Sequence, residues 1–151
     1  MTGREKKEYN DLFFVCSLIE YIGRKTKNHR NVVINTIGKD KLQHLYELAD
    51  IYHSENIDKI TDELISTFHI EEGRFDNVED GKYSIPSHWD IGKVYKRLIV
   101  DICNEQDKEP IDTLIEVYNS WLSRKIEDFN SSLYYENPDY LYQSYIRGEV
   151  L

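Results

Sequence analysis

Residues 91–103 read IGKVYKRLIVDIC, and residues 111–129 read IDTLIEVYNSWLSRKIEDF. In the first stretch the apolar residues recur at steps of three and four, at Ile91, Val94, Tyr95, Leu98, Ile99, Ile102 and Cys103. Such steps return to one face of a helix with 3.6 residues per turn, so they predict a helix with one buried face. Ser87 and Asp90 have the spacing of a capping pair, which predicts where this helix begins.

Similar spacing predicts helices over most of the remaining chain. The expected ranges are 5–22, 28–37, 39–53, 57–68 and 110–129, and a last short helix is expected from Asn137 and Pro138 to Gly148. Proline suits the first turn of a helix, and glycine suits its end. We therefore expect an all-α fold, a compact bundle of six or seven amphipathic helices with no significant β-sheet.

The helical periodicity is lost over residues 71–86, which are rich in Gly, Asp and Asn. Connections of this length are uncommon in compact domains. A chain of 151 residues is long enough for one core, since such a domain buries about 68–70% of the surface that its unfolded chain exposes. We expect a single helical domain over residues 1–151, with 71–86 as the seam if there are two helical halves.

Cysteine usage and hydropathy bear on where the protein resides. Cys16 and Cys103 both fall on apolar helix faces, where a thiol behaves as a small hydrophobe, so we expect no disulfide. The chain has no apolar run of the roughly 18 residues that a membrane span needs, and residues 1–10 lack the apolar core of a signal peptide. We expect a cytoplasmic protein without membrane contact.

The net charge of −9 is distributed unevenly along the chain. Residues 1–30 carry a net +3, and residues 31–151 carry a net −12. Because most of the surface would repel phosphate, we expect no binding to nucleic acid. The one basic cluster is interpreted as a solvated helix end, and it comprises Arg24, Lys25, Lys27, His29 and Arg30.

Residues 18–65 carry a family resemblance. The residues concerned are Ile19, Glu20 and Tyr21, then Leu42, Leu45 and Tyr46, and then Asp50, Tyr52, His53 and the helix start over Asn56 to Ile60. With them this segment resembles a family of small bacterial all-helical domains of unknown function. The resemblance implies a helical arrangement and supplies no activity.

The sequence offers few reasons to propose catalysis or a metal. Asp50 and His53 lie three residues apart, with Glu47 one turn earlier, but di-metal helical sites take a Glu-x-x-His motif from each of two helices. We therefore favour a hydrogen-bonded His53 and expect no metal and no cofactor. No nucleophile elbow, phosphate loop or His-Glu-x-x-His motif is present, so we name no catalytic residue and favour a protein that is not an enzyme.

The start of the helix at Ser87 is the best candidate for an anion site. Free backbone amides are expected around Ser87 and His88, with Lys93 and Arg97 within two or three turns. The simpler interpretation, which we favour, makes Ser87 a helix cap and Trp89 an anchor in the core.

Tyrosines crowd the end of the chain, at positions 134, 135, 140, 142 and 145. Tyr140 and Tyr142 point about 200° apart on a helix, so some of these rings must face solvent or a partner. Tyrosine is enriched at protein interfaces. The candidate partner-binding residues are therefore Tyr134, Tyr135, Tyr140 and Tyr145; the alternative is that the rings lie flat along the edge of the bundle.

These observations favour a protein-interaction module that associates with another protein or with itself. Two alternatives stay open. One is an accessory or neutralising partner in a bacterial toxin or defence system, for which the acidic surface is the cue. The other is a small anionic-ligand binder or enzyme that uses the start of the helix at Ser87.

Overall fold

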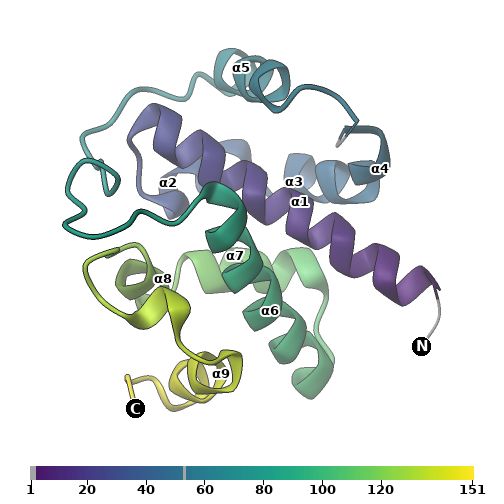
Figure 1. Ribbon diagram of the computed structural model, residues 1–151. Helices are drawn as coiled ribbons and strands as arrows, with labels where there is room; N and C mark the ends of the chain where they lie inside the picture. Colours follow the sequence, from purple (N-terminus) through teal and green to yellow (C-terminus); the bar gives the residue numbers. More distant parts are fainter. Residues whose placement is uncertain (1–2, 53) are drawn as a thin grey trace.

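The two longest helices cross in the middle of the molecule (Figure 1). These are α1 (Gly3–Thr26) and α6 (His88–Gln106), and they form the most extensive contact between any two helices. The computed structural model describes residues 3–52 and 54–151, with side chains from Lys7 onward. Because α1 and α6 lie on opposite sides of residues 71–86 in the sequence, their contact joins the two halves of the chain.

Shorter helices surround this crossing. On one side of α1 lie α2 (Arg30–Ile37), α3 (Lys39–Glu47), α4 (Ala49–Tyr52) and α5 (Ile57–Phe68). Residues after α6 form α7 (Pro110–Tyr118), α8 (Trp121–Ile126), the 3₁₀ turn η1 (Leu133–Tyr135) and α9 (Pro138–Arg147). The predicted all-α fold is confirmed: the chain is 69% helical and the described residues contain no strand.

The close approach of α1 and α6 depends on a small residue at their crossing. A Cβ atom added to Gly92 would lie 2.8 Å from the Cα of Ser17, which is closer than carbon atoms pack. Gly92 is helical, so its value here is the missing side chain and not its backbone freedom. The capping pair predicted at the start of α6 is confirmed, since Ser87 and Asp90 each accept a hydrogen bond from the other's backbone amide.

One cluster of buried side chains draws residues from both halves of the chain. Leu98 in α6 and Leu114 in α7 are 1% and 0% exposed, in agreement with the apolar spacing. Cys16 is fully buried, whereas Cys103, expected on a buried stripe, is only half-buried; both thiols are free. Burial raises the pKa of both thiols.

Two of the predicted helices are each divided into two shorter helices. The helix expected over 110–129 ends at Tyr118, because Ser120 donates from its hydroxyl to the Val117 carbonyl at 2.6 Å and takes up extended backbone angles. The helix expected over 39–53 breaks at Leu48. By contrast α1 runs past Ile22 to Thr26, whose hydroxyl donates to the Ile22 carbonyl.

Residues 71–86 are irregular, as predicted, but they are tied to the helices at both ends. The amides of Gly73 and Phe75 donate to the carbonyls of Thr26 and Lys27, each at 2.8 Å. Further along, the Asn77 side chain donates to the Glu127 carbonyl at the end of α8. This loop therefore spans from the end of α1 to the end of α8. No helix in the described part of the chain is long and apolar enough to cross a membrane.

Candidate functional site

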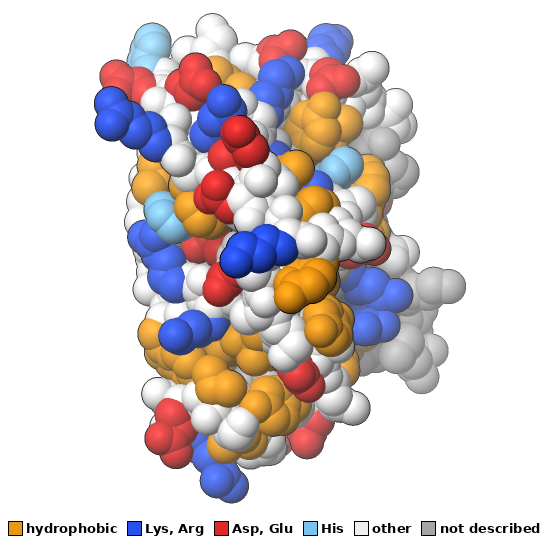
Figure 2. All heavy atoms as spheres, turned by 60° about the vertical axis from the view of Figure 1, so that its left-hand side comes forward, with side chains coloured by type: hydrophobic (Ala, Val, Ile, Leu, Met, Phe, Trp, Pro, Cys, Tyr) orange, Lys and Arg blue, Asp and Glu red, His pale blue; other side chains and the backbone are white. Residues whose placement is uncertain are grey.

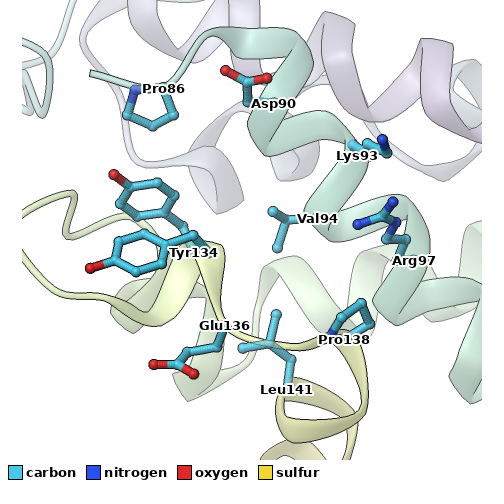
Figure 3. A pocket seen from close by; sticks show the side chains of 10 residues that line it. Pro86, Asp90, Lys93, Val94, Arg97, Tyr134, Glu136, Pro138 and Leu141 are labelled. Atoms are coloured by element: carbon cyan, nitrogen blue, oxygen red, sulfur yellow. The ribbon is translucent and has the colours of Figure 1, made fainter. Parts of the chain in front are cut away.

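A cleft opens between α6 and the segment formed by η1 and the start of α9. Its volume is about 340 Å³. Lys93, Val94 and Arg97 line it from α6, Tyr134 lines it from η1, and Leu141 lines it from α9 (Figure 3). We call this the α6–α9 cleft. Its volume lies near the lower end of the roughly 300–1,000 Å³ typical of binding pockets.

The four candidate tyrosines divide into two pairs. Tyr134 and Tyr135 line the cleft, with their rings in an edge contact at 4.9 Å between centroids. Tyr134 also meets the buried ring of Phe129 at 5.6 Å, which fixes its position, while Tyr135 is 68% exposed. The other two pack on the bundle and do not line the cleft; the Tyr140 hydroxyl donates to the Leu151 carbonyl.

Tyr145 and Tyr135 should therefore respond differently to truncation. Tyr145 is half-buried against the core, and burial, with Glu116 nearby, raises the pKa of its hydroxyl. We expect Tyr145→Ala to lower the free energy of unfolding by about 1 kcal/mol or more, and Tyr135→Ala by less than about 0.5 kcal/mol. Denaturant unfolding of the two variants measures both. Equal losses would contradict the division into packing and cleft tyrosines.

Only two of the four residues proposed for an anion site line the cleft. Lys93 and Arg97 line the cleft, whereas the His88 ring lies against Tyr21 of α1 at 4.8 Å and takes no part in the cleft. Burial lowers the pKa of His88, and the nearby Arg24 adds to the effect. Ser87 is engaged in the cap. The structure thus brings two of the four anion candidates together with two of the four tyrosines.

Two carboxylates also border the cleft, and both are engaged by neighbours in the chain. Asp90 accepts from the Ser87 amide at 2.9 Å, and Glu136 accepts from the Ser132 hydroxyl at 3.0 Å. Lys93 and Arg97 make no ion pair with any residue that the structure describes. The cleft therefore offers two cations that are free to bind a ligand.

The surface around this end of the molecule is more apolar than the rest of the same face. Figure 2 shows hydrophobic side chains gathered over its lower part, at the level of α8 and α9, while acidic and basic side chains alternate above. Exposed apolar residues near the end of the chain include Ile146, Val150 and Leu151 at 46–47%. Contiguous apolar surface of this kind is typical of interaction sites.

A second groove is lined by Trp89, which was expected to be an anchor in the core. Trp89 is 43% exposed, so the expectation that it lies in the core is wrong. Its ring packs on Phe13 at 5.7 Å and lines a shallow hollow together with Ile57. The expectation failed because α6 begins at the edge of the bundle, where its first turn lies partly beyond α1.

The expected basic cluster at the end of α1 is not a solvated patch. Arg30 is fully buried, and Arg24 packs over the Phe129 ring at 5.4 Å, where burial lowers the pKa of its guanidinium. Lys25 pairs with Asp62 at 2.8 Å, and Lys27 pairs with Glu72. The prediction of a solvated cluster is therefore wrong for Arg24 and Arg30, because α1 and α2 turn these side chains inward.

Arg30 is the centre of a buried polar cluster, in which its side chain forms an ion pair with Glu20 and its backbone amide binds Glu127. Its Nε donates to a Glu20 oxygen at 3.1 Å, and its backbone amide donates to Glu127 at 3.0 Å. The Tyr118 hydroxyl donates to the second Glu20 oxygen at 3.0 Å. A Cβ atom at Gly23 would lie 2.6 Å from Arg30 Nε, so only glycine leaves room for this side chain.

Burial raises the pKa of Glu20, although Arg30 and Tyr118 both act in the opposite direction. The pKa of the buried Tyr118 hydroxyl is also raised, by burial and by the nearby Glu20. These contacts join α1, α2 and α7 with the end of α8.

The metal hypothesis concerned Glu47, Asp50 and His53. His53 lies outside the described residues, so that interpretation stays a prediction. Asp50 forms an ion pair with Lys7 at 3.2 Å. Among the side chains that the structure describes, no three His, Cys, Asp or Glu residues gather as ligands.

The sequence predicted two tyrosines and two cations of the cleft as candidate site residues, but it did not predict the apolar lining. Val94 was interpreted only as a helix-face residue, Pro86 only as part of the irregular stretch 71–86, and Pro138 only as a helix-start signal, while Leu141 was not singled out. No local pattern reveals that η1 folds back on α6, because this depends on the position of α8. A recognisable signal did exist for the buried cluster: Glu20 and Arg30 both fall in phase with the apolar stripes of their helices.

No family model, curated protein or solved structure matches the chain. The resemblance of residues 18–65 to small bacterial helical domains therefore stays a prediction from its residues. The geometry and charge of the cleft carry the functional argument.

Proposed function

We propose that this protein is a protein-interaction module that holds a partner protein in the α6–α9 cleft. The observation that carries the proposal is that one cleft combines the exposed Tyr135, the half-buried Val94, and Lys93 and Arg97, which form no ion pair with the described residues. Tyrosine and arginine are among the residues most enriched where interfaces gain their binding energy. An apolar floor with a charged rim is also the usual arrangement of such sites.

A different protein fits the cleft better than a second copy of this chain. Each copy carries a net charge of −9, so two copies repel each other at long range. The small-anion alternative has less support, because Asp90 already accepts from the Ser87 amide at the start of α6 and adds negative charge to the cleft. A partner protein can contact both the apolar and the charged residues of the cleft, whereas a small anion contacts only the charged ones.

The proposal is tested by comparing two exposed tyrosines that differ only in position. Tyr135 lines the cleft and is 68% exposed; Tyr83 does not line it and is 70% exposed. Wild type, Tyr135→Ala and Tyr83→Ala are immobilised and used to capture proteins from an extract of the cells that express the chain. We expect one protein to be retained by wild type and by Tyr83→Ala and to be reduced about tenfold or more on Tyr135→Ala.

Retention that Tyr135→Ala and Tyr83→Ala reduce equally would contradict the proposal, because the binding surface would then lie elsewhere or extend over the loop at Tyr83. Retention of nothing by the wild type would contradict it as well. Thermal unfolding of both variants serves as the control for folding.

A further inference from the structure

The hollow beside Trp89 is lined mainly by aromatic and apolar side chains, and we call it the Trp89 hollow. Its lining comes from α1, from the first turns of α5 and α6, and from the residue chain just before α5; it comprises Asn10, Phe13, Phe14, Glu55, Ile57 and Trp89. The volume is about 450 Å³, which lies within the roughly 300–1,000 Å³ typical of binding pockets. The hollow is therefore large enough for a small ligand or a long side chain.

Trp89 is the most exposed aromatic side chain in this hollow. It is 43% exposed, whereas Phe13 is half-buried and Phe14 is 6% exposed. The rings of Trp89 and Phe13 are inclined by 44°, with 5.7 Å between their centroids. They are not stacked face to face, so neither ring covers the other completely. The hollow thus offers aromatic surface from two helices at one place.

Elsewhere in the molecule, aromatic rings carry cations from the same chain. Three such rings have a Lys or Arg group at 5.4–6.0 Å from the centroid, in the pairs Arg24–Phe129, Lys41–Tyr52 and Lys96–Tyr9. Tryptophan presents the best aromatic face for a cation. None of the Lys and Arg side chains that the structure describes lies over Trp89 or Phe13. The Trp89 ring is therefore available to a cation from outside the chain.

The charge of the lining also favours a cation. Among the described residues that line the hollow, only Glu55 carries a charge, and its side chain is exposed. Lys93 lies one turn after Trp89 on α6, but it lines the α6–α9 cleft instead. The net charge of −9 attracts cations to the molecule at long range. A carboxylate beside exposed aromatic rings is the arrangement expected of a site for an organic cation.

The hollow suits a cation with apolar substituents better than a primary ammonium group. A primary ammonium is compact and strongly hydrated, so it requires several hydrogen-bond acceptors in exchange for its water. Side-chain oxygens of the lining come only from Glu55 and Asn10, whereas Phe13, Ile57 and Trp89 offer apolar contact. Aromatic pockets of this kind recognise quaternary ammonium groups.

We infer that the Trp89 hollow binds a trimethylammonium group. The cation lies over the Trp89 ring, its methyl groups contact Phe13 and Ile57, and Glu55 supplies the opposing charge. Small molecules of the choline type and trimethylated lysine side chains both carry this group. The hollow is separate from the α6–α9 cleft, and the inference does not depend on the partner proposed for that cleft.

The test is a titration of the folded full-length chain with choline, followed by NMR. The indole signal of Trp89, identified by its loss in Trp89→Phe, reports binding at the hollow. The matched control ligand is dimethylbutanol, in which a carbon atom replaces the charged nitrogen of choline. We expect choline to shift the Trp89 signal and to bind about tenfold more tightly than dimethylbutanol.

Variants then test the two side chains that recognise the charge. The dissociation constant of choline, followed through backbone amide signals of α1 and α5, should rise about tenfold in Trp89→Ala and about threefold in Glu55→Gln. Glu63→Gln is the matched control, because it removes the same charge from an exposed position on α5 outside the lining. It should bind choline as wild type does. If Trp89→Ala does not fold, Trp89→Leu replaces it.

Equal binding of choline and dimethylbutanol would overturn the inference, because the hollow would then recognise shape and not charge. An unchanged Trp89 signal at about 0.1 M choline, or equal affinity of wild type and Trp89→Ala, would overturn it as well. A trimethyllysine peptide that binds more tightly than choline, and more tightly than its unmethylated form, would identify a methylated protein as the source of the group. Weaker binding of the peptide than of choline would identify a small molecule.

The α6–α9 cleft provides the last control. Tyr135→Ala should bind choline as wild type does, and Trp89→Ala should retain the partner protein captured through the cleft. Failure of the cleft proposal would therefore leave choline binding intact, and failure of choline binding would leave the capture of the partner intact.

Discussion

Arg30→Ala is expected to lower the free energy of unfolding by about 3–5 kcal/mol, which is the usual loss when one partner of a buried ion pair is removed. Glu20 is 1% exposed, and among the described residues it would keep only the Tyr118 hydroxyl as a hydrogen-bond partner. Denaturant unfolding followed by circular dichroism measures the loss. Lys25→Ala removes an exposed ion pair with Asp62 and should unfold at the same denaturant concentration as wild type.

The loss of stability caused by Arg30→Ala should become smaller as the pH is lowered. Burial raises the pKa of Glu20 in the folded protein, and removal of Arg30 raises it further, so the folded variant keeps a proton that the unfolded chain releases. Such a group stabilises the fold fully below its unfolded pKa, and this stabilisation is lost as the pH rises through the folded pKa. The difference from wild type should therefore shrink as the pH falls toward about 4.

Glu20→Gln/Arg30→Ala provides the matched control, because glutamine carries no charge and still accepts a hydrogen bond from Tyr118. This double variant should be more stable than Arg30→Ala at neutral pH. Equal stability of the two at every pH would show that the buried charge of Glu20 is not what makes Arg30 necessary.

Leu114→Ala is expected to lower the free energy of unfolding by about 2–5 kcal/mol. Leu114 is 0% exposed in α7, and its truncation leaves a cavity where α7 packs against its neighbours. Ile146→Ala is the control, since Ile146 is 46% exposed on α9 and should change stability by less than about 0.5 kcal/mol. A loss of under about 1 kcal/mol for Leu114→Ala would place this face of α7 at the surface.

Local spacing was sufficient to predict the class of the fold and most helix positions. The apolar stripe over Ile91 to Ile102 and the capping pair at Ser87 both appear in α6 as expected. The breaks at Leu48 and Ser120 were not predicted, because they depend on how each turn packs and on side-chain bonds to backbone carbonyls. Hydrogen bonds between a side chain and backbone carbonyls do not change the spacing of the apolar residues, so the periodic pattern does not reveal them.

The candidate site was only partly predictable for a related reason. Tyr134 and Tyr135 stood out by composition, and Lys93 and Arg97 by their place on a helix, yet the two pairs are about 40 residues apart in the sequence. Their meeting depends on α8 and η1 turning the chain back toward α6. Arg30 was misinterpreted because a charge near a helix end is normally solvated. Its phase with Val33, Ile34 and Ile37 was the overlooked sign of burial.

The central claim, that a partner protein occupies the α6–α9 cleft, is tested most directly by photocross-linking in the cells that express the chain. A photoreactive benzoylphenylalanine is placed at position 135 in one variant and at position 51 in another; Ile51 is 59% exposed on α4, at the other end of the molecule. We predict that illumination joins the position-135 variant to one protein of defined mass and leaves the position-51 variant free of that adduct. The same adduct from both positions, or none from position 135, would contradict the claim.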